Sequence, residues 1–256
     1  MPADAGTSPA ERLQPLPWHP GCEPAAAPPA DPTMPPLLLL LDRRQPIGEE
    51  IRQCLAASLS CLEQRRLSAY RLAADKERFL LGRGSLRRLL GLWLGLPPEA
   101  VPLETGPRGK PHCACGPAFN LSHSGDLILL AAHASRAVGV DVERLRPSLH
   151  WQAIANRMLP PPERQALAAF PERQRPEAFL AAWCRLEARL KAHGTGLVAR
   201  ERLGAEVESA PLSAAWARAE PLWDVAVPEG YRAAVALAPP SLTARTATPD
   251  RTAPPD

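Results

Sequence analysis

Two acidic residues at alternate positions of an apolar segment are the first candidates for chemistry. In residues 138–143, alternation along a β-strand would place the valines on one face and Asp141 and Glu143 on the other. Two ionised carboxylates side by side repel each other, so such a pair is either solvated or held by a cation. Mg²⁺ takes carboxylate oxygens and keeps water or phosphate oxygens in its remaining positions. The pair predicts either a Mg²⁺ site or the solvated acidic end of a strand.

A third carboxylate and a lysine lie one turn apart on a long helical pattern. Apolar spacing predicts a helix over residues 177–193, with Glu187 at the edge of its apolar stripe. A carboxylate in that position needs a partner, and Lys191 could supply it as an ordinary pair four residues on. Alternatively, Glu187 is a third metal ligand beside the strand pair, and Lys191 points toward a phosphate of a ligand.

A polar segment, Asn-Leu-Ser-His-Ser-Gly-Asp, occupies residues 120–126. Strand alternation puts Ser122 and His123 on opposite faces, so they are poorly placed to act as a Ser–His nucleophile pair. The sequence also lacks the G-x-S-x-G turn that exposes a nucleophilic serine in hydrolases. The hydroxyl, the imidazole and the N–H groups of the turn are better suited to phosphate or ribose contacts. A plain polar hairpin is the alternative.

These residues need a scaffold, and the pattern of elements predicts a mixed α/β (α+β) fold. Strands are expected at residues 37–42, 119–123, 127–133, 137–143, 223–227 and 231–237. Helices are expected at 49–62, within 64–94, and at 149–159, 162–170 and 177–193. We expect the strands at 127–133 and 137–143 to form an antiparallel pair.

The two halves of the chain resemble each other at an offset of 100 residues. Five positions of the first-half helical region recur as Glu177, Phe179, Leu180, Leu186 and Leu190. Asp42, at the end of the first strand, similarly parallels Asp141. Two amphipathic helices drawn from a Leu-rich composition would explain these identities as well as a duplication would. If the halves are duplicated, a site between them is expected.

Proline marks the expected limits of the fold. Of the 32 prolines, 11 lie in residues 1–36 and 5 in residues 239–256. Both ends are therefore expected to be disordered Pro/Ala-rich tails outside the fold. The rest of the chain is expected to divide into an N-terminal subdomain, 37–135, and a C-terminal subdomain, 136–238, that carries the metal site.

Composition argues against several classes of protein. The most apolar run, residues 37–41, is far shorter than the roughly 20 residues of a membrane-spanning helix. Basic residues are not interleaved with aromatics as in a nucleic-acid platform, although the net charge of +6 on residues 37–238 suits a polyanionic ligand or an acidic partner. The six cysteines form no disulfide framework, which predicts a reducing cytoplasm. His112, Cys113 and Cys115 could form one corner of a metal site, but no second ligand pair lies at a usable spacing.

Taken in order, the motifs resemble those of the larger, Sfp-type 4′-phosphopantetheinyl transferases. The resemblance rests on residues 109–111, 119–126, 139–143 and 179–197, and weaker agreement covers most of 37–238. It implies two similar α/β subdomains related by a pseudo-two-fold axis, with coenzyme A in the cleft between them. The implied reaction transfers the 4′-phosphopantetheine group of coenzyme A to a serine of an apo acyl or peptidyl carrier protein and releases adenosine 3′,5′-bisphosphate.

The resemblance also implies a role for each motif residue. Mg²⁺ would be held against the pyrophosphate of coenzyme A by Asp141, Glu143 and Glu187. The expected catalytic residues are Glu187, Lys191 and Glu163. The phosphates and adenosine of coenzyme A would be bound by Arg66, Arg78, Lys110, Ser122, His123 and Lys191. The proton of the carrier serine could pass to Glu187 or to a metal-bound water.

One position departs from the family pattern. Leu186 stands where the family usually has a lysine, immediately before the helix glutamate. Because Leu186 completes the apolar stripe, we expect it to pack and one cationic contact to the cofactor to be lost. A catalytically silent protein that binds coenzyme A or a carrier protein is therefore an alternative, as is a Mg²⁺-dependent phosphohydrolase. The expected protein is a cytoplasmic monomer that binds neither nucleic acid nor a membrane.

Overall fold

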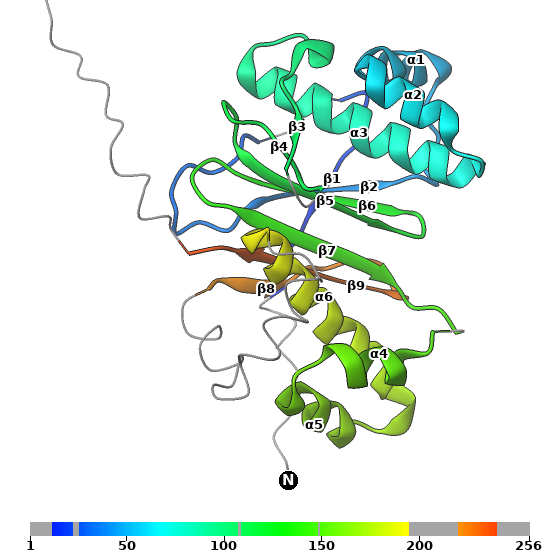
Figure 1. The fold of residues 1–256 in the computed structure, drawn as a ribbon, viewed down its shortest axis with the longest axis vertical. Helices are drawn as coiled ribbons and strands as arrows, with labels where there is room; N and C mark the ends of the chain where they lie inside the picture. The colour runs from blue at the N-terminus through cyan, green and yellow to red at the C-terminus, as the bar shows by residue number, and fades with distance from the viewer. Residues whose placement is uncertain (1–11, 23–25, 107–108, 148, 195–219, 240–256) are drawn as a thin grey trace, which may run out of the picture.

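The elements of the protein form four layers, in which two sheets lie between two sets of helices (Figure 1). The structure is a computed structural model that describes residues 12–22, 26–106, 109–147, 149–194 and 220–239. Leu38 and Leu129 of the first sheet share a buried cluster with Val140 and Val235 of the second, so the two sheets pack face to face. The predicted mixed α/β class is confirmed.

The first sheet has the strand order β1-β2-β6-β5. Its bounds are β1 (Leu16–Pro17), β2 (Leu37–Asp42), β5 (Ala118–Ser124) and β6 (Leu127–His133). Alternation along β2 sends Leu37, Leu39 and Leu41 into the core beneath the first-half helices, whereas Leu38 faces the second sheet. The strands predicted at 37–42 and 127–133 are confirmed with the same bounds, and β5 extends the predicted strand by one residue at each end.

The outer face of this sheet is covered by α3 (Ala73–Leu94) and α1 (Glu49–Ala57), and α2 (Cys61–Ala69) packs against α3. The single helix predicted over 49–62 is wrong, because Ser60 starts a second helix. Its hydroxyl accepts from Glu63 N (3.4 Å), and Glu63 Oε2 accepts from Ser60 N (2.9 Å). A short helix, η2 (Pro98–Ala100), and the small hairpin β3 (Glu104–Thr105) and β4 (Pro111–His112) lead back to β5.

The second sheet has the order β7-β9-β8 and is covered by α6. The bounds in this half are β7 (Val138–Arg144), α4 (Trp151–Met158), α5 (Pro161–Ala169), η3 (Glu172–Gln174), α6 (Arg175–His193), β8 (Leu222–Asp224) and β9 (Tyr231–Leu237). Helix α6 crosses β7 at Gly139, where an added Cβ would lie 2.1 Å from Ala188 O. Only glycine allows the helix to approach the strand this closely.

The predicted pairing of 127–133 with 137–143 is wrong. Strand β6 pairs with β2 and β5, whereas β7 pairs with β9, so the chain changes sheets at residues 134–137. The buried Arg136 side chain secures this crossing, because its guanidinium donates to Ala238 O (2.6 Å) and Pro32 O (3.0 Å). Both strands were predicted from the sequence, but their actual pairing partners were not.

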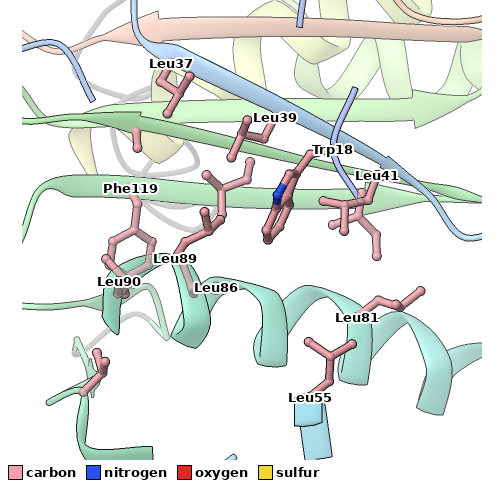
Figure 2. Packing of buried hydrophobic residues seen from close by; sticks show 14 of the residues in the cluster. Trp18, Leu37, Leu39, Leu41, Leu55, Leu81, Leu86, Leu89, Leu90 and Phe119 are labelled. Carbon is pink, nitrogen blue, oxygen red and sulfur yellow. The ribbon is translucent and has the colours of Figure 1, made fainter. Parts of the chain in front are cut away.

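The prediction that residues 1–36 lie outside the fold is wrong for their described part. Strand β1 pairs in parallel with β2, and Trp18 is only 7% exposed. Figure 2 shows Trp18 beside Leu39 and Leu41, on the side of the sheet that faces α3. Leu13 also forms a bridge with Val225 of the second half. Proline count was misleading here, because a few apolar side chains and backbone pairings suffice to order a proline-rich segment. Residues 1–11 and 240–256 lie outside the described residues.

Both sheets share one topology. In each half the first strand is followed by helices and then by two more strands, and the third strand lies in the middle: β2-β6-β5 and β7-β9-β8. The long helices α3 and α6 cover the outer faces of the two sheets (Figure 1). Among the described helices, none is both long and apolar enough to cross a membrane.

Candidate active site

The two halves meet along β5 and β7 through side chains instead of a backbone ladder. Asn120 Oδ1 accepts from Val140 N (2.8 Å), Ser122 Oγ from Val142 N (3.3 Å), and Ser124 Oγ from Arg144 N (3.1 Å). We call Asn120, Ser122 and Ser124 the polar rail. Its three members lie on one face of β5, as alternation along a strand requires, and all three are buried.

Asp141 is the most enclosed of the three predicted metal ligands, with 3% of its surface exposed. Its Oδ1 accepts from Lys191 Nζ (2.6 Å) and from Ser122 Oγ (2.9 Å), whereas Oδ2 is buried without a partner. Lys191 therefore pairs with Asp141 across the α6–β7 contact. The alternative pair within the helix, between Lys191 and Glu187, is not the contact that the structure shows.

Glu143 and Glu187 lie near enough to Asp141 for the charges to interact. Burial raises the pKa of Glu143, the hydrogen bond from Ser124 counteracts this, and the charge of Asp141 adds to it. Burial also raises the pKa of Glu187, which Lys191 counteracts and the two other carboxylates reinforce. Glu187 Oε1 is buried without a partner. Three carboxylates from β7 and α6 thus share a poorly solvated region with one lysine.

The three carboxylates fit a hard divalent cation by type and by their unpaired oxygens. Oxygen ligands suit Mg²⁺, and Asp141 Oδ2 and Glu187 Oε1 are buried acceptors that a cation would satisfy. Within the described residues, no three His, Cys, Asp or Glu side chains are grouped closely enough to hold a metal as they stand. His112, Cys113 and Cys115 therefore do not form a metal site in this structure either. Cation binding therefore requires at least one of the three carboxylate side chains to turn toward the others.

Lys110 reaches the same region from the loop after β3. Its Nζ donates to Lys191 O (2.5 Å) at the end of α6 and to Val138 O (3.0 Å) at the start of β7. Burial lowers the pKa of Lys110 to about 8, and the charge of Lys191 adds to the shift. In this arrangement Lys110 ties the first half to the second, where the sequence predicted a phosphate contact.

A cavity of about 350 Å³ lies beside α3 and collects most of the remaining predicted residues. Its lining includes Arg66, Arg78, Arg83, His123 and Phe79. The guanidinium of Arg66 lies over the ring of Phe79 at 5.2 Å, and Arg78 pairs with Asp75. Partial desolvation and the charge of Arg78 lower the pKa of His123. Three arginines and a neutral imidazole form a pocket suited to an anion.

Gly109 and Pro111, on either side of Lys110, also line this cavity. Ser122 and His123 point to opposite sides of β5, as predicted: the serine bonds to Asp141 and the histidine lines the cavity. The strand thereby connects the arginine-lined cavity to the carboxylate cluster.

Comparison with known proteins follows the same division into halves. Residues 44–135 match the family "4′-phosphopantetheinyl transferase, N-terminal", and residues 137–236 match the 4′-phosphopantetheinyl transferase superfamily. The chain is 36% identical over 205 residues to the 4′-phosphopantetheinyl transferase HetI of Nostoc sp., an alignment that covers 76% of this chain and 86% of HetI. The chain belongs to the 4′-phosphopantetheinyl transferase superfamily.

Two other relatives match shorter stretches. A putative 4′-phosphopantetheinyl transferase of Synechocystis sp. is 35% identical over 145 residues, which cover 55% of this chain and 59% of the relative. The 4′-phosphopantetheinyl transferase psf-1 of Bacillus pumilus is 35% identical over 130 residues, which cover 50% and 54%. The chain thus spans a little over half of these two relatives, whereas it spans most of HetI.

Glu163 and Leu186 are the two remaining positions that the sequence singled out. Glu163 lies near enough to Arg189 for their charges to interact: burial lowers the pKa of that guanidinium, and Glu220 and Glu163 counteract the shift. Glu163 Oε2 is buried without a hydrogen-bond partner. Leu186 packs against the buried cluster around Phe179, as its place in the apolar stripe predicted.

Sequence analysis missed two residues of this transferase site. Asn120 and Ser124 flank Ser122 on the polar rail, and Ser124 Oγ donates to Glu143 Oε2 (2.6 Å). The signal was present, because the segment carries polar side chains at three alternate positions. The face they would contact was unknown, since β5 and β7 are not hydrogen-bonded as neighbouring strands.

Proposed function

We propose that this transferase moves the 4′-phosphopantetheine group of coenzyme A to a serine of an apo acyl or peptidyl carrier protein. The product would be the holo carrier protein, and adenosine 3′,5′-bisphosphate would be released. The observation that carries the proposal is the adjacency of two sites: an arginine-lined cavity on one side of β5 and three carboxylates with a lysine on the other. A substrate with several phosphates and one reacting pyrophosphate needs both.

The cavity supplies the binding of the nucleotide end in this proposal. Arg66 and Arg78 provide charge for phosphate oxygens, and the Phe79 ring offers an apolar surface. His123, with its lowered pKa, is neutral near pH 7 and can donate one hydrogen bond without adding charge. Arg83 carries a partner already, because its Nε lies 3.4 Å from Glu63 Oε1.

The carboxylate cluster supplies the reacting end. Asp141, Glu143 and Glu187 would hold Mg²⁺, which when bound would neutralise charge on the pyrophosphate oxygens. Lys191 is kept in place by Asp141, Ser122 and Val140 O (3.2 Å), and its ammonium can stabilise charge that develops on the leaving phosphate. The carboxylate of Glu187 would accept the proton of the attacking serine.

We further infer that the two halves are related by a pseudo-two-fold axis and that they correspond to residues 37–135 and 136–238. The shared strand order β2-β6-β5 and β7-β9-β8 supports this relation. The residues that recur at an offset of 100 lie on α3 and α6, which cover the outer faces of the two sheets. The site would then form where the halves meet. A cytoplasmic location is in keeping with six free cysteines, and the protein would act as a monomer.

One assay decides among the possible activities. Purified protein is incubated with coenzyme A, Mg²⁺ and an apo carrier domain, and the mass of the intact carrier domain is then measured by mass spectrometry. A phosphopantetheine adduct on the carrier is expected. Binding of coenzyme A without an adduct would favour a silent binding protein, and cleavage of coenzyme A without an adduct would favour a phosphohydrolase.

A matched pair of variants tests the site within that assay. Asp141→Asn keeps the shape of the side chain but removes the negative charge beside Lys191, so we expect transfer to fall by at least about 100-fold. Asp42→Asn is the control, because Asp42 is a carboxylate of β2 in the first half whose bond is to Arg44 (2.9 Å). Equal activity of the two variants would contradict the assignment.

A further inference from the structure

Ser124 occupies the end of the polar rail where the rail meets a carboxylate. Its Oγ donates to Glu143 Oε2 (2.6 Å) and accepts from Arg144 N (3.1 Å). The residue is only 4% exposed, so water does not compete for the hydroxyl. Because a lone pair of Ser124 Oγ accepts the backbone N–H of Arg144, the hydroxyl proton is directed at the carboxylate of Glu143.

The turn that follows Ser124 is held by both halves of the molecule. Gly125 O accepts from Arg78 Nη1 (3.2 Å), and Asp126 N donates to Tyr231 Oη (3.0 Å). Gly125 has φ +57°, and an added Cβ would lie 2.5 Å from Tyr231 Oη. The position of Ser124 is therefore fixed by contacts that do not involve Glu143.

Each carboxylate of the cluster is oriented differently. Asp141 is held by Ser122 and Lys191, whereas Glu187 Oε1 has no partner. Glu143 receives its hydrogen bond from Ser124, and this bond engages Oε2 alone. Of the two glutamates, Glu143 is thus the one whose orientation is set by a neighbouring side chain, Ser124, before a cation binds.

We propose that Ser124 is a positioning residue for Glu143: it holds the carboxylate in the orientation in which the other oxygen, Oε1, can bind a divalent cation. The inference rests on the proposed function and extends it to a residue outside the motif roles. A hydrogen bond to a ligating carboxylate restricts its rotation and lowers the entropy lost when the ion binds. Removing it should weaken cation binding.

Asn120 offers a matched control for a purely structural role. It joins the same two strands through Val140 N (2.8 Å), it is 6% exposed, and its hydrogen bond is to the backbone of β7 and not to a carboxylate. If the rail only joins the halves, loss of either side chain should affect cation binding alike.

The experiment compares Ser124→Thr with Ser124→Val in the full chain. The two side chains have nearly the same shape, and only threonine retains a hydroxyl. Mn²⁺ affinity is measured by isothermal titration calorimetry, and the Mg²⁺ concentration for half-maximal transfer is measured with the apo carrier domain. We expect valine to weaken Mn²⁺ binding 10- to 100-fold relative to threonine and to raise the Mg²⁺ requirement similarly, with the KM for the carrier domain unchanged.

The outcomes separate the two proposals. Equal Mn²⁺ affinity for the threonine and valine variants, in a wild-type protein that transfers, overturns the role of Ser124 alone. A wild-type protein that binds no Mn²⁺ and transfers nothing overturns the proposed function with it. If a β-branched side chain prevents folding, Ser124→Ala is compared with Asn120→Ala: weaker Mn²⁺ binding in the serine variant only supports the inference, and equal weakening overturns it.

Discussion

At the residue scale, Lys191 joins the carboxylate of Asp141 to the side chain of Lys110. Its ammonium contacts Asp141, Ser122 and Val140 O, and its backbone carbonyl accepts from Lys110. A buried ion pair of this kind is costly to break on one side only, because the remaining charge is left without a partner. The pair therefore keeps the lysine in place before any ligand arrives.

The two predicted glutamates should respond differently to the same substitution. Glu187→Gln removes a carboxylate from the cluster, and we expect kcat/KM for coenzyme A to fall at least about 100-fold. Glu163→Gln should keep transfer within about 3-fold of wild type, because the charge of Glu163 acts on Arg189 and is not among the charges that shift the pKa of Glu187. Steady-state transfer assays on both variants check this. A large loss in Glu163→Gln would return that residue to the catalytic set.

At the element scale, the N-terminal segment acts as a strap across the first sheet. Strand β1 extends the sheet at β2, Trp18 enters the core beneath α3, and Leu13 reaches the second half. Pro29 O accepts from Ala134 N (2.9 Å) next to the point where the chain changes sheets. The N-terminal segment thus supports residues 134–137, where the chain crosses from the first sheet to β7.

Truncation tests this strap directly. Deletion of residues 1–35 removes Trp18 and β1, and we expect the free energy of unfolding to fall by about 3 kcal/mol or more, the usual cost of losing a buried tryptophan. Deletion of residues 1–11 leaves every described contact and serves as the control. Urea unfolding of both truncated chains and of the full protein measures the difference. Equal stability of the two truncated chains would contradict a structural role for residues 12–22 and 26–35.

At the scale of the whole molecule, the site exists because two halves are joined by polar side chains. The polar rail and Lys110 reach from the first half to the backbone of the second, and Arg136 of the second half donates to Pro32 O of the N-terminal segment. Such contacts are directional, so they fix the relative position of the halves more closely than apolar packing alone. The carboxylates and the arginine-lined cavity are held in register as a result.

Lys110 makes this joint sensitive to pH. Its pKa is lowered to about 8, against about 10.4 for an unfolded lysine, so the unfolded chain binds more protons between these values. The stability that Lys110 contributes should therefore rise as pH increases from 8 to about 10, because the cost of burying its charge disappears. Unfolding of wild type and Lys110→Met by urea at pH 7.5, 9 and 10 isolates this contribution. A constant difference between the two proteins would contradict the lowered pKa.

The sequence by itself determined most elements and the residue types of the site. Hydrophobic periodicity placed β2, β6 and β9 at their observed bounds and α6 within two residues, since local spacing carries that signal. Strand alternation also assigned the valines of β7 to one face and Asp141 and Glu143 to the other. These are properties of neighbouring residues, which the order of the chain fixes directly.

Only the tertiary structure decided which of these residues meet. Lys191 bonds Asp141 instead of Glu187, Ser122 and Lys110 bond across the halves, and Glu163 lies by Arg189. The pairing of β7 with β9 and the inclusion of β1 in the first sheet likewise could not be predicted from the sequence. Each depends on contacts between segments far apart in the chain, whose free energy is set by the packing of whole sheets and helices and leaves no periodic trace in the local sequence.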